Sequence, residues 1–288
     1  MKIIIKLLRA KHWVKNLFIF IPIFFSGDIF NFEKLIPTTI VFIGFSLIAS
    51  FVYIINDAFD INFDQNHPTK KNRPLAAGLI TLKKALMIGF VVLIFGLSLI
   101  YYISFNSFIV ALIYVALNLL YSSFLKNTSI VDFIIVSLGF VFRILIGGFV
   151  GEIELSKWII IMIFLLSLFL SVSKRRDDVF QFENYNKINR LVVSQYNLEF
   201  IDKLISIIST TLLVSYLLFI SSNEVLSKYP SDFHIFSFFF VLMGVFRYIQ
   251  IIYVDNKSGS PVKVFFNDKF LKVILTLWIT FFLIIIYI

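Results

Sequence analysis

The sequence predicts an all-α integral membrane protein, a bundle of nine transmembrane helices with a cytoplasmic amino terminus. Three observations lead to this fold class: the composition, nine separate apolar runs, and an alternation of basic residues between successive loops. Hydrophobic residues make up 59% of the 288 residues, 37 residues are Phe, and the mean hydropathy is +0.94. Soluble globular chains contain about 45–50% apolar residues. The composition therefore places the chain in a lipid bilayer.

Apolar runs of about 20 residues, the length that crosses a bilayer as a helix, occur nine times. They cover residues 14–32, 35–56, 79–103, 105–125, 130–150, 156–173, 201–222, 233–254 and 268–287. The first run contains Pro22, Gly27 and Asp28, so we expect it to be kinked or short. No soluble domain or low-complexity linker separates the runs, and we expect residues 1–288 to form a single transmembrane catalytic domain.

The loops support the same topology, because Lys and Arg collect in cytoplasmic loops. Most of the 26 basic residues lie before the first run or in the even-numbered loops, whereas the odd-numbered loops hold only Lys34, Lys157 and Lys228. This alternation predicts a multi-pass protein of the cytoplasmic membrane. The net charge of +9 then belongs to the cytoplasmic face, where it favours anionic lipid and anionic substrate and gives no reason to expect nucleic acid.

The residue types restrict the chemistry of any site. The chain has no Cys, and its three His (His12, His67 and His234) are scattered. Disulfides, thiolate metal sites and a cysteine nucleophile are excluded, and a histidine metal site is not indicated. A bound metal would be held by oxygen ligands.

The most informative stretch begins at Asn56, where the second apolar run ends in concentrated charge. If a helix continues through it, Asp57, Asp60 and Asp64 fall within roughly a 60° arc of one face. Three carboxylates so close to lipid need cations, and hard oxygen ligands favour Mg²⁺, which commonly carries substrate phosphates. The basic residues Lys70 and Arg73 that follow would help to bind those phosphates. The simpler alternative is that the carboxylates only pair with Arg or Lys.

A second charged cluster ends the sixth run, with Lys174, Arg175 and Arg176 followed by Asp177 and Asp178. Its position matches that of the first cluster four runs earlier, which suggests a two-fold repeat in which one half holds metal and the other grips phosphate. The alternative is a stop-transfer charge run with ion pairs inside one helix.

Several polar residues within or beside the runs are further candidates for substrate binding. Arginine within a bilayer is costly and commonly functional, so Arg143 and Arg247 are candidates, although structural ion pairs would also explain them. Lys15 and Asn16 could face the same pocket or anchor the first run at the headgroups. Tyr121 could bind substrate, but tyrosine is also common at membrane interfaces.

These motifs resemble the UbiA superfamily of intramembrane prenyltransferases, and more narrowly its polyprenyl-phosphate phosphoribosyltransferase branch. The superfamily motif is Asn56-Asp57-x-x-Asp60-x-x-x-Asp64. The motifs similar to the branch are Arg9-x-Lys11-x-Trp13-Val14-Lys15-Asn16, His67-Pro68-x-Lys70-x-x-Arg73-Pro74-x-Ala76-x-Gly78, Lys174-Arg175-Arg176, Val193-Ser194-x-Tyr196-Asn197 and Arg247-Tyr248. Aromatic prenyltransferases of the superfamily typically carry a second Asp-x-x-x-Asp motif. In this chain adjacent Asp177 and Asp178 occupy the corresponding region instead, which weakens the case for an aromatic acceptor.

The resemblance implies Mg²⁺-dependent transfer of 5-phosphoribose from 5-phosphoribosyl 1-diphosphate to a polyprenyl phosphate, with release of diphosphate. It implies that Asp57, Asp60 and Asp64 are catalytic and hold the metal. The substrate-binding residues would be Lys15, Asn16, Asn56, Lys70, Arg73, Tyr121, Arg143, Lys174, Arg175, Asp178 and Arg247. The active site would face the cytoplasm, and related enzymes make a homo-oligomer plausible.

Two alternatives stay open at this point. One is a prenyltransferase that moves a prenyl group from a prenyl diphosphate to an aromatic or glycerol phosphate acceptor, with the same aspartates and Mg²⁺. The other is a cation-coupled transporter with Asp57, Asp60 and Asp64 as its ion site. Charge clusters at one face, instead of at the midplane, disfavour transport.

Overall fold

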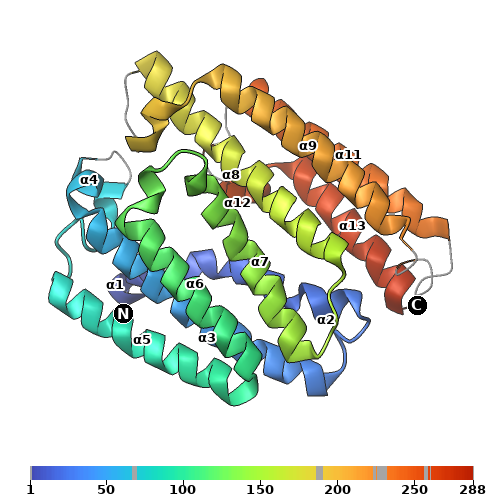
Figure 1. Ribbon diagram of the computed structural model, residues 1–288, viewed down its shortest axis with the longest axis horizontal. Helices are drawn as coiled ribbons and strands as arrows, with labels where there is room; N and C mark the ends of the chain where they lie inside the picture. The colour runs from blue at the N-terminus through green and yellow to red at the C-terminus, as the bar shows by residue number, and fades with distance from the viewer. Residues whose placement is uncertain are drawn as a thin grey trace. The chain divides into compact units, whose positions relative to one another are not determined.

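The computed structural model describes residues 2–66, 70–185, 191–222, 225, 232–255, 259 and 261–287, and this part of the chain is helical without any strand (Figure 1). It divides into two compact units, Met1–Leu155 and Ser156–Ile288. The predicted all-α class is confirmed. His67 and Pro68 of the sequence motif lie outside the described residues.

The first unit contains four long helices and several short ones. The long helices are α3 (Phe32–Phe59), α5 (Leu82–Ile103), α6 (Phe105–Ser123) and α7 (Val131–Gly151). The short elements are α1 (Lys2–Leu7), the 3₁₀ helix η1 (Ala10–Phe20), α2 (Ile21–Phe25), α4 (Ile61–Gln65), η2 (Lys70–Asn72) and η3 (Leu125–Asn127). Helix α3 packs along α5 and also contacts η1, α6 and α7. It is therefore the central helix of the unit.

Small residues allow α3 and α5 to approach closely. A Cβ atom on Gly44 would lie 2.9 Å from the carbonyl oxygen of Gly96, and one on Gly96 would lie 2.6 Å from the carbonyl oxygen of Gly44. Small residues let helix backbones meet in a membrane, where van der Waals packing drives association. Next to this crossing, Phe45 and Ile48 of α3 are fully buried in the core of the unit.

The first predicted run, 14–32, is not a single long helix. It forms most of η1, followed directly by α2, with Pro22 in the first turn of α2. Helix η1 is unusual because 3₁₀ runs longer than three or four residues are uncommon. It packs against α3 and α7, and a Cβ atom on Gly147 of α7 would lie only 2.0 Å from the carbonyl oxygen of Ile19. Only glycine fits at this contact.

Within the described residues, the second unit contains four long helices and several short ones. The long helices are α8 (Lys157–Tyr185), α9 (Leu198–Ile220), α11 (Ser237–Tyr253) and α13 (Lys269–Tyr287), and the short ones are η4 (Leu191–Gln195), η5 (Asp232–Phe236) and α12 (Pro261–Asn267). Helix α8 packs along α9, and α11 contacts both α9 and α13.

Eight helices of the described chain are long and apolar enough to cross a membrane. They correspond to the second to ninth predicted runs, so these eight predictions are confirmed. The bounds agree within a few residues, except that α8 continues to Tyr185, whereas the sixth run was predicted to end at residue 173. The structure supports a multi-pass membrane protein.

Candidate functional site

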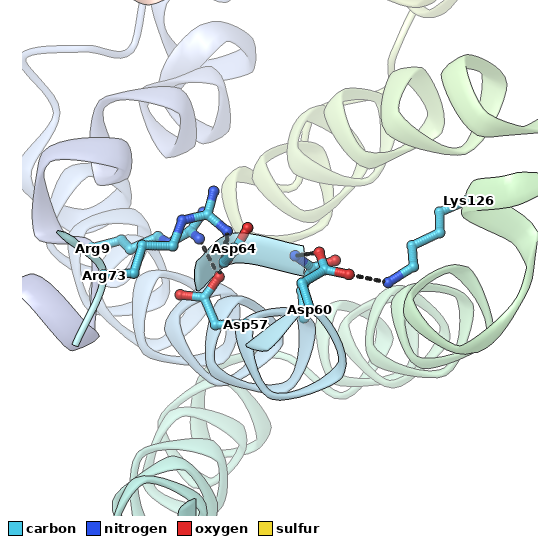
Figure 2. Close-up of polar contacts among 7 residues, drawn as sticks. Arg9, Asp57, Asp60, Asp64, Arg73 and Lys126 are labelled. Carbon is cyan, nitrogen blue, oxygen red and sulfur yellow. Dashed lines mark hydrogen bonds and ion pairs between the residues drawn. The ribbon is translucent and has the colours of Figure 1, made fainter. Parts of the chain in front are cut away.

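The aspartate cluster forms where α3 ends. Helix α3 stops at Phe59, and Asp60 takes a non-helical backbone conformation (φ −99°, ψ 6°) before α4 begins at Ile61. The continuous helix that would place three carboxylates on one arc is therefore broken at its middle member. The expected arc is wrong in this respect: Asp57 and Asp64 lie together, whereas Asp60 turns elsewhere (Figure 2).

Asp57 and Asp64 share one guanidinium group. Arg73 donates from one nitrogen to Oδ1 of Asp57 at 3.0 Å and also to Oδ2 of Asp64. Oδ1 of Asp57 accepts a second hydrogen bond, from Arg9. The two carboxylate side chains are only 3% and 1% exposed, and without these cations two buried negative charges would repel each other. The sequence left open that these carboxylates pair with Arg or Lys, and the structure contains such pairs with Arg9 and Arg73.

Asp60 has a separate set of partners. Its Oδ1 accepts from Nζ of Lys126 at 2.5 Å, and its Oδ2 accepts from Nδ2 of Asn56 at 3.1 Å. Lys126 lies in η3, between α6 and α7, and its ammonium group is 5.9 Å from the ring centre of Phe59. Three cations, Arg9, Arg73 and Lys126, thus balance three carboxylates (Figure 2).

Sequence reasoning did not select Arg9 or Lys126 as site residues. Arg9 lies 48 residues before Asp57, and Lys126 lies 66 residues after Asp60, so no local spacing links either pair. Arg9 has left-handed backbone angles (φ 49°, ψ 44°), and its guanidinium lies 5.0 Å from the ring centre of Tyr53. Burial lowers the pKa of Arg9, and the Asp57 carboxylate opposes that shift. The one signal in the sequence that could have identified Arg9 as a site residue is its place in the motif Arg9-x-Lys11-x-Trp13-Val14-Lys15-Asn16.

The donor set fits a hard divalent cation. Asp57, Asp60 and Asp64 offer carboxylate oxygens, the ligands that Mg²⁺ prefers. Oδ1 of Asp64 is buried and has no hydrogen-bond partner within the described chain. An unsatisfied buried oxygen is costly, and a cation would satisfy it. The described residues contain no ready-made cluster of three acidic or histidine ligands, in line with the separation of Asp60.

Three further residues of this unit were predicted to bind substrate: Lys70, Tyr121 and Asn56. Nζ of Lys70 lies 5.6 Å from the ring centre of Phe63 in α4, so Lys70 is close to the cluster along the chain. Tyr121 is buried near the end of α6. Asn56 bonds to Asp60, as described above. Substrate binding by Lys70, Tyr121 and Asn56 stays a prediction.

Arg143 and Asn16 meet inside the first unit. Nε of Arg143 donates to Oδ1 of Asn16 at 2.8 Å, and both side chains are buried. Lys15 directly precedes Asn16 in η1. The structure thus brings together Asn16 and Arg143, two of the predicted substrate-binding residues.

The charged cluster of α8 has mostly structural partners. Arg175 pairs with Asp178 one turn later at 2.7 Å, as the stop-transfer alternative predicts for a local ion pair. Arg176 donates to Asp202 of α9 at 2.7 Å and to the carbonyl oxygen of Ile252 at 3.0 Å, which ties three helices together. Lys174 is exposed.

Arg247 also has protein partners. Its Nε and one terminal nitrogen donate to Oδ2 of Asp268 at 3.2 and 2.7 Å, and Asp255 lies at 3.6 Å. Asp268 in turn accepts from the backbone of Leu271 at 2.8 Å at the start of α13. Arg247 therefore links the end of α11 to the start of α13, and these contacts favour the structural alternative.

Known proteins resemble this chain in sequence. Residues 17–273 match the sequence profile of the UbiA prenyltransferase family. A decaprenyl-phosphate phosphoribosyltransferase of Corynebacterium glutamicum is 30% identical over 96% of this chain and 84% of its own length. The enzyme of the same name from Mycolicibacterium smegmatis is 28% identical over 96% and 90%.

A solved structure has a similar fold. The UbiA homologue of Archaeoglobus fulgidus, bound to GPP and Mg²⁺, superposes with a TM-score of 0.72 over 99% of both chains at 18% identity. At this identity the likeness concerns the fold. It shows that the arrangement of helices in this protein is one that is found in solved structures.

Proposed function

The chain belongs to the UbiA prenyltransferase family, and from this premise we propose that it is a polyprenyl-phosphate phosphoribosyltransferase. It transfers 5-phosphoribose from 5-phosphoribosyl 1-diphosphate to a polyprenyl phosphate and releases diphosphate. The names of the C. glutamicum and M. smegmatis relatives support this reaction, since each similarity extends over 96% of the chain. In this proposal residues 1–288 act as a single catalytic domain.

The observation that carries the proposal is the cation–carboxylate cluster. Arg9, Arg73 and Lys126 are held by aspartates, and guanidinium groups bind phosphate oxygens as well as carboxylate oxygens. If Asp57, Asp60 and Asp64 hold Mg²⁺, the three basic side chains are released to bind the diphosphate and phosphate groups of the sugar. A site able to exchange cations in this way suits a highly charged anionic substrate.

The reaction needs charge stabilisation more than proton transfer. Breaking the bond between C1 of the ribose and the diphosphate builds positive charge on the ring and negative charge on the leaving group. Asp57, Asp60 and Asp64 would hold Mg²⁺, whose positive charge would neutralise the leaving diphosphate. Arg73 and Lys126 bind and orient that diphosphate. The acceptor is already a phosphate anion, so no strong general base is needed.

We predict that Lys70, Lys174 and Arg175 bind the 5-phosphate and the diphosphate of the sugar substrate. Asn56 and Asp178 would orient Asp60 and Arg175 respectively, since each forms a hydrogen bond with that neighbour. Tyr121 stays a predicted substrate contact.

We also propose the ninth crossing, with the amino terminus and the active site on the cytoplasmic side of the cytoplasmic membrane. Eleven 3₁₀ residues at about 2.0 Å each and five α-helical residues at about 1.5 Å each cover about 30 Å, the thickness of a bilayer core. Elements η1 and α2 are thus long enough together to cross it. The distribution of Lys and Arg gives the orientation.

The function is tested with purified protein in detergent, labelled 5-phosphoribosyl 1-diphosphate, a polyprenyl phosphate and Mg²⁺. We expect label to enter the organic phase in a Mg²⁺-dependent manner, and to be lost in Asp60→Ala and with EDTA. No label from folded protein, together with transfer of a labelled prenyl chain to an aromatic or glycerol phosphate acceptor, would replace this function with the prenyltransferase alternative.

A further inference from the structure

Arg143 has an unusual environment for a charged side chain in the middle of a membrane helix. It is 4% exposed, and its guanidinium carbon lies 5.0, 5.5 and 5.3 Å from the ring centres of Phe45, Tyr114 and Phe140. Its hydrogen bonds go to neutral groups, Oδ1 of Asn16 and, at 2.5 Å, the carbonyl oxygen of Gly139. No carboxylate of the described chain pairs with it. The aromatic rings partly replace the missing counter-ion.

Asn16 connects this buried cation to α3. Its amide oxygen accepts from Arg143, and its Nδ2 donates to Oγ of Ser46 at 2.8 Å. Asn16 is 1% exposed, so both ends of its amide are used inside the unit. The side chain therefore fixes η1 to α7 on one side and to α3 on the other.

The same contacts continue along η1 toward the aspartates. Nε1 of Trp13 donates to Oγ of Ser50 at 3.0 Å, one turn of α3 beyond Ser46. The hydroxyl of Ser50 in turn approaches the carbonyl oxygen of Leu8 at 2.8 Å, directly before Arg9. The next contact is that of Arg9 with Asp57. Polar contacts thus run from Arg143 through η1 to the candidate metal ligands.

We propose that Arg143 is a positioning residue, which anchors η1 through Asn16 and thereby holds Arg9 beside the aspartates, where its guanidinium pairs with Asp57 and can also reach a bound diphosphate. Two features of η1 make an anchor necessary. Its 3₁₀ hydrogen bonds are weaker in geometry than those of an α-helix, and Arg9, which precedes it, adopts a left-handed conformation that is unfavourable for a residue other than glycine. Both persist only where surrounding contacts fix them.

A direct role for Arg143 in binding the lipid phosphate is the competing explanation. Two of the three guanidinium nitrogens already have protein partners, and the side chain is enclosed by rings. A positioning role uses these contacts as they are, whereas phosphate binding would have to break them. The geometry therefore favours positioning.

Trp13 provides a test that does not depend on activity. In a Trp158→Phe, Trp278→Phe background, Trp13 is the single tryptophan of the chain. We expect Arg143→Gln and Asn16→Leu each to shift Trp13 emission to the red and to raise acrylamide quenching about two-fold, because the segment opens locally. Asn16→Asp keeps the acceptor for Arg143 and should retain native fluorescence. Arg176→Gln, a buried arginine of the second unit, is the matched control and should leave Trp13 unchanged.

A kinetic cycle tests the link to Arg9 and rests on the proposed function. Arg9→Gln and Arg143→Gln should each raise the KM for the sugar diphosphate about ten-fold, and the double variant should be little worse than either single one. Unchanged Trp13 fluorescence in folded Arg143→Gln and Asn16→Leu would overturn the proposal, as would an increase confined to the KM for polyprenyl phosphate. If no phosphoribosyl transfer is found at all, the fluorescence result still decides the anchoring.

Discussion

Two charged clusters stand at helix ends that look equivalent in the sequence, but the structure gives them different partners. At the end of α3, the aspartates bind cations from distant segments, Arg9 before the helix and Lys126 beyond α6. Within α8, which continues to Tyr185, Arg175 binds Asp178 three residues away on the same helix. Within the described residues, the aspartates of the first cluster are paired only with cations from other segments. In the second cluster one ion pair lies within a single helix, and Arg176 binds Asp202 of the neighbouring α9.

This difference indicates which cluster can respond to a ligand. A local pair such as Arg175 and Asp178 satisfies itself with little help from the fold. The cluster of α3 instead holds buried carboxylates that are balanced by arginines from other segments. Arginine also binds phosphate, so an anionic ligand can compete for the same side chains. It also leaves Oδ1 of Asp64 unsatisfied. The comparison therefore favours the end of α3 as the position of the proposed metal site.

The largest expected effect compares Asp57→Asn with Asp178→Asn. We expect Asp57→Asn to lower kcat by about 10³-fold or more, because a metal ligand at the developing charge is lost. Asp178→Asn should cost about ten-fold or less, since Asn can still accept a hydrogen bond from Arg175. Steady-state transfer assays measure both. Equal losses would mean that the two clusters share the metal chemistry.

The next effect concerns two arginines and the melting temperature. Arg73→Gln leaves Asp57 and Asp64 without their shared cation, so we expect lower stability that added Mg²⁺ restores, through a larger Mg²⁺-dependent rise in Tm than in the native protein. Arg176→Gln should cost about 2 kcal/mol with or without Mg²⁺. Thermal unfolding in detergent across a Mg²⁺ series separates them. An identical Mg²⁺ response in both variants would contradict the metal assignment of Asp57 and Asp64.

A smaller effect distinguishes long-range from local lysine pairs. Lys126→Met should lower kcat/KM about ten-fold, because its partner Asp60 belongs to the candidate site. Lys203→Met breaks an exposed pair with Glu199, four residues earlier on α9, and should change stability by at most about 0.5 kcal/mol with activity unaffected. Both are single substitutions of a paired lysine. A Lys126→Met enzyme with native kcat/KM would remove Lys126 from the site.

The smallest effect is the pH dependence of the Arg247–Asp268 pair. Hydrogen bonds from Arg247 hold the pKa of Asp268 below its ordinary value, and the backbone N–H of Leu271 adds to this. A carboxylate with a lowered folded pKa stabilises the fold above its unfolded pKa of about 3.9, and this contribution is lost as pH falls below that value toward the folded pKa.

Asp268→Asn tests this, because Asn can still accept from Leu271. The difference in Tm between native and variant protein should be constant from about pH 7 to 5 and shrink below about pH 4. A constant difference throughout would show that the charge of Asp268 contributes no stability.

Much of the fold could be predicted because it depends on local composition. The eight confirmed spans follow from apolar length alone. The 14–32 run was harder, since its observed form depends on packing: η1 fits against α7 only because Gly147 has no Cβ at the carbonyl of Ile19. Hydropathy does not distinguish such a 3₁₀ segment from an α-helix.

The candidate site was predicted in part for the same reason. Asp57, Asp60, Asp64 and Arg73 stand within one short stretch of chain. Arg9 and Lys126 come from far away in the sequence, and no spacing rule links them to the aspartates. For Arg143 and Arg247 the sequence left both substrate binding and a structural role open, and the structure supplies protein partners for both.

The sequence by itself determined a helical membrane protein, because the cost of placing polar groups in lipid acts on each segment independently. It also determined that any metal would be held by oxygen. Only the tertiary structure decided that α3 stops at Phe59, that Asp60 binds Lys126, and that Arg143 forms a hydrogen bond with Asn16. These depend on which side chains from distant segments meet, and pairing between buried charges is fixed by distance and burial in the folded chain.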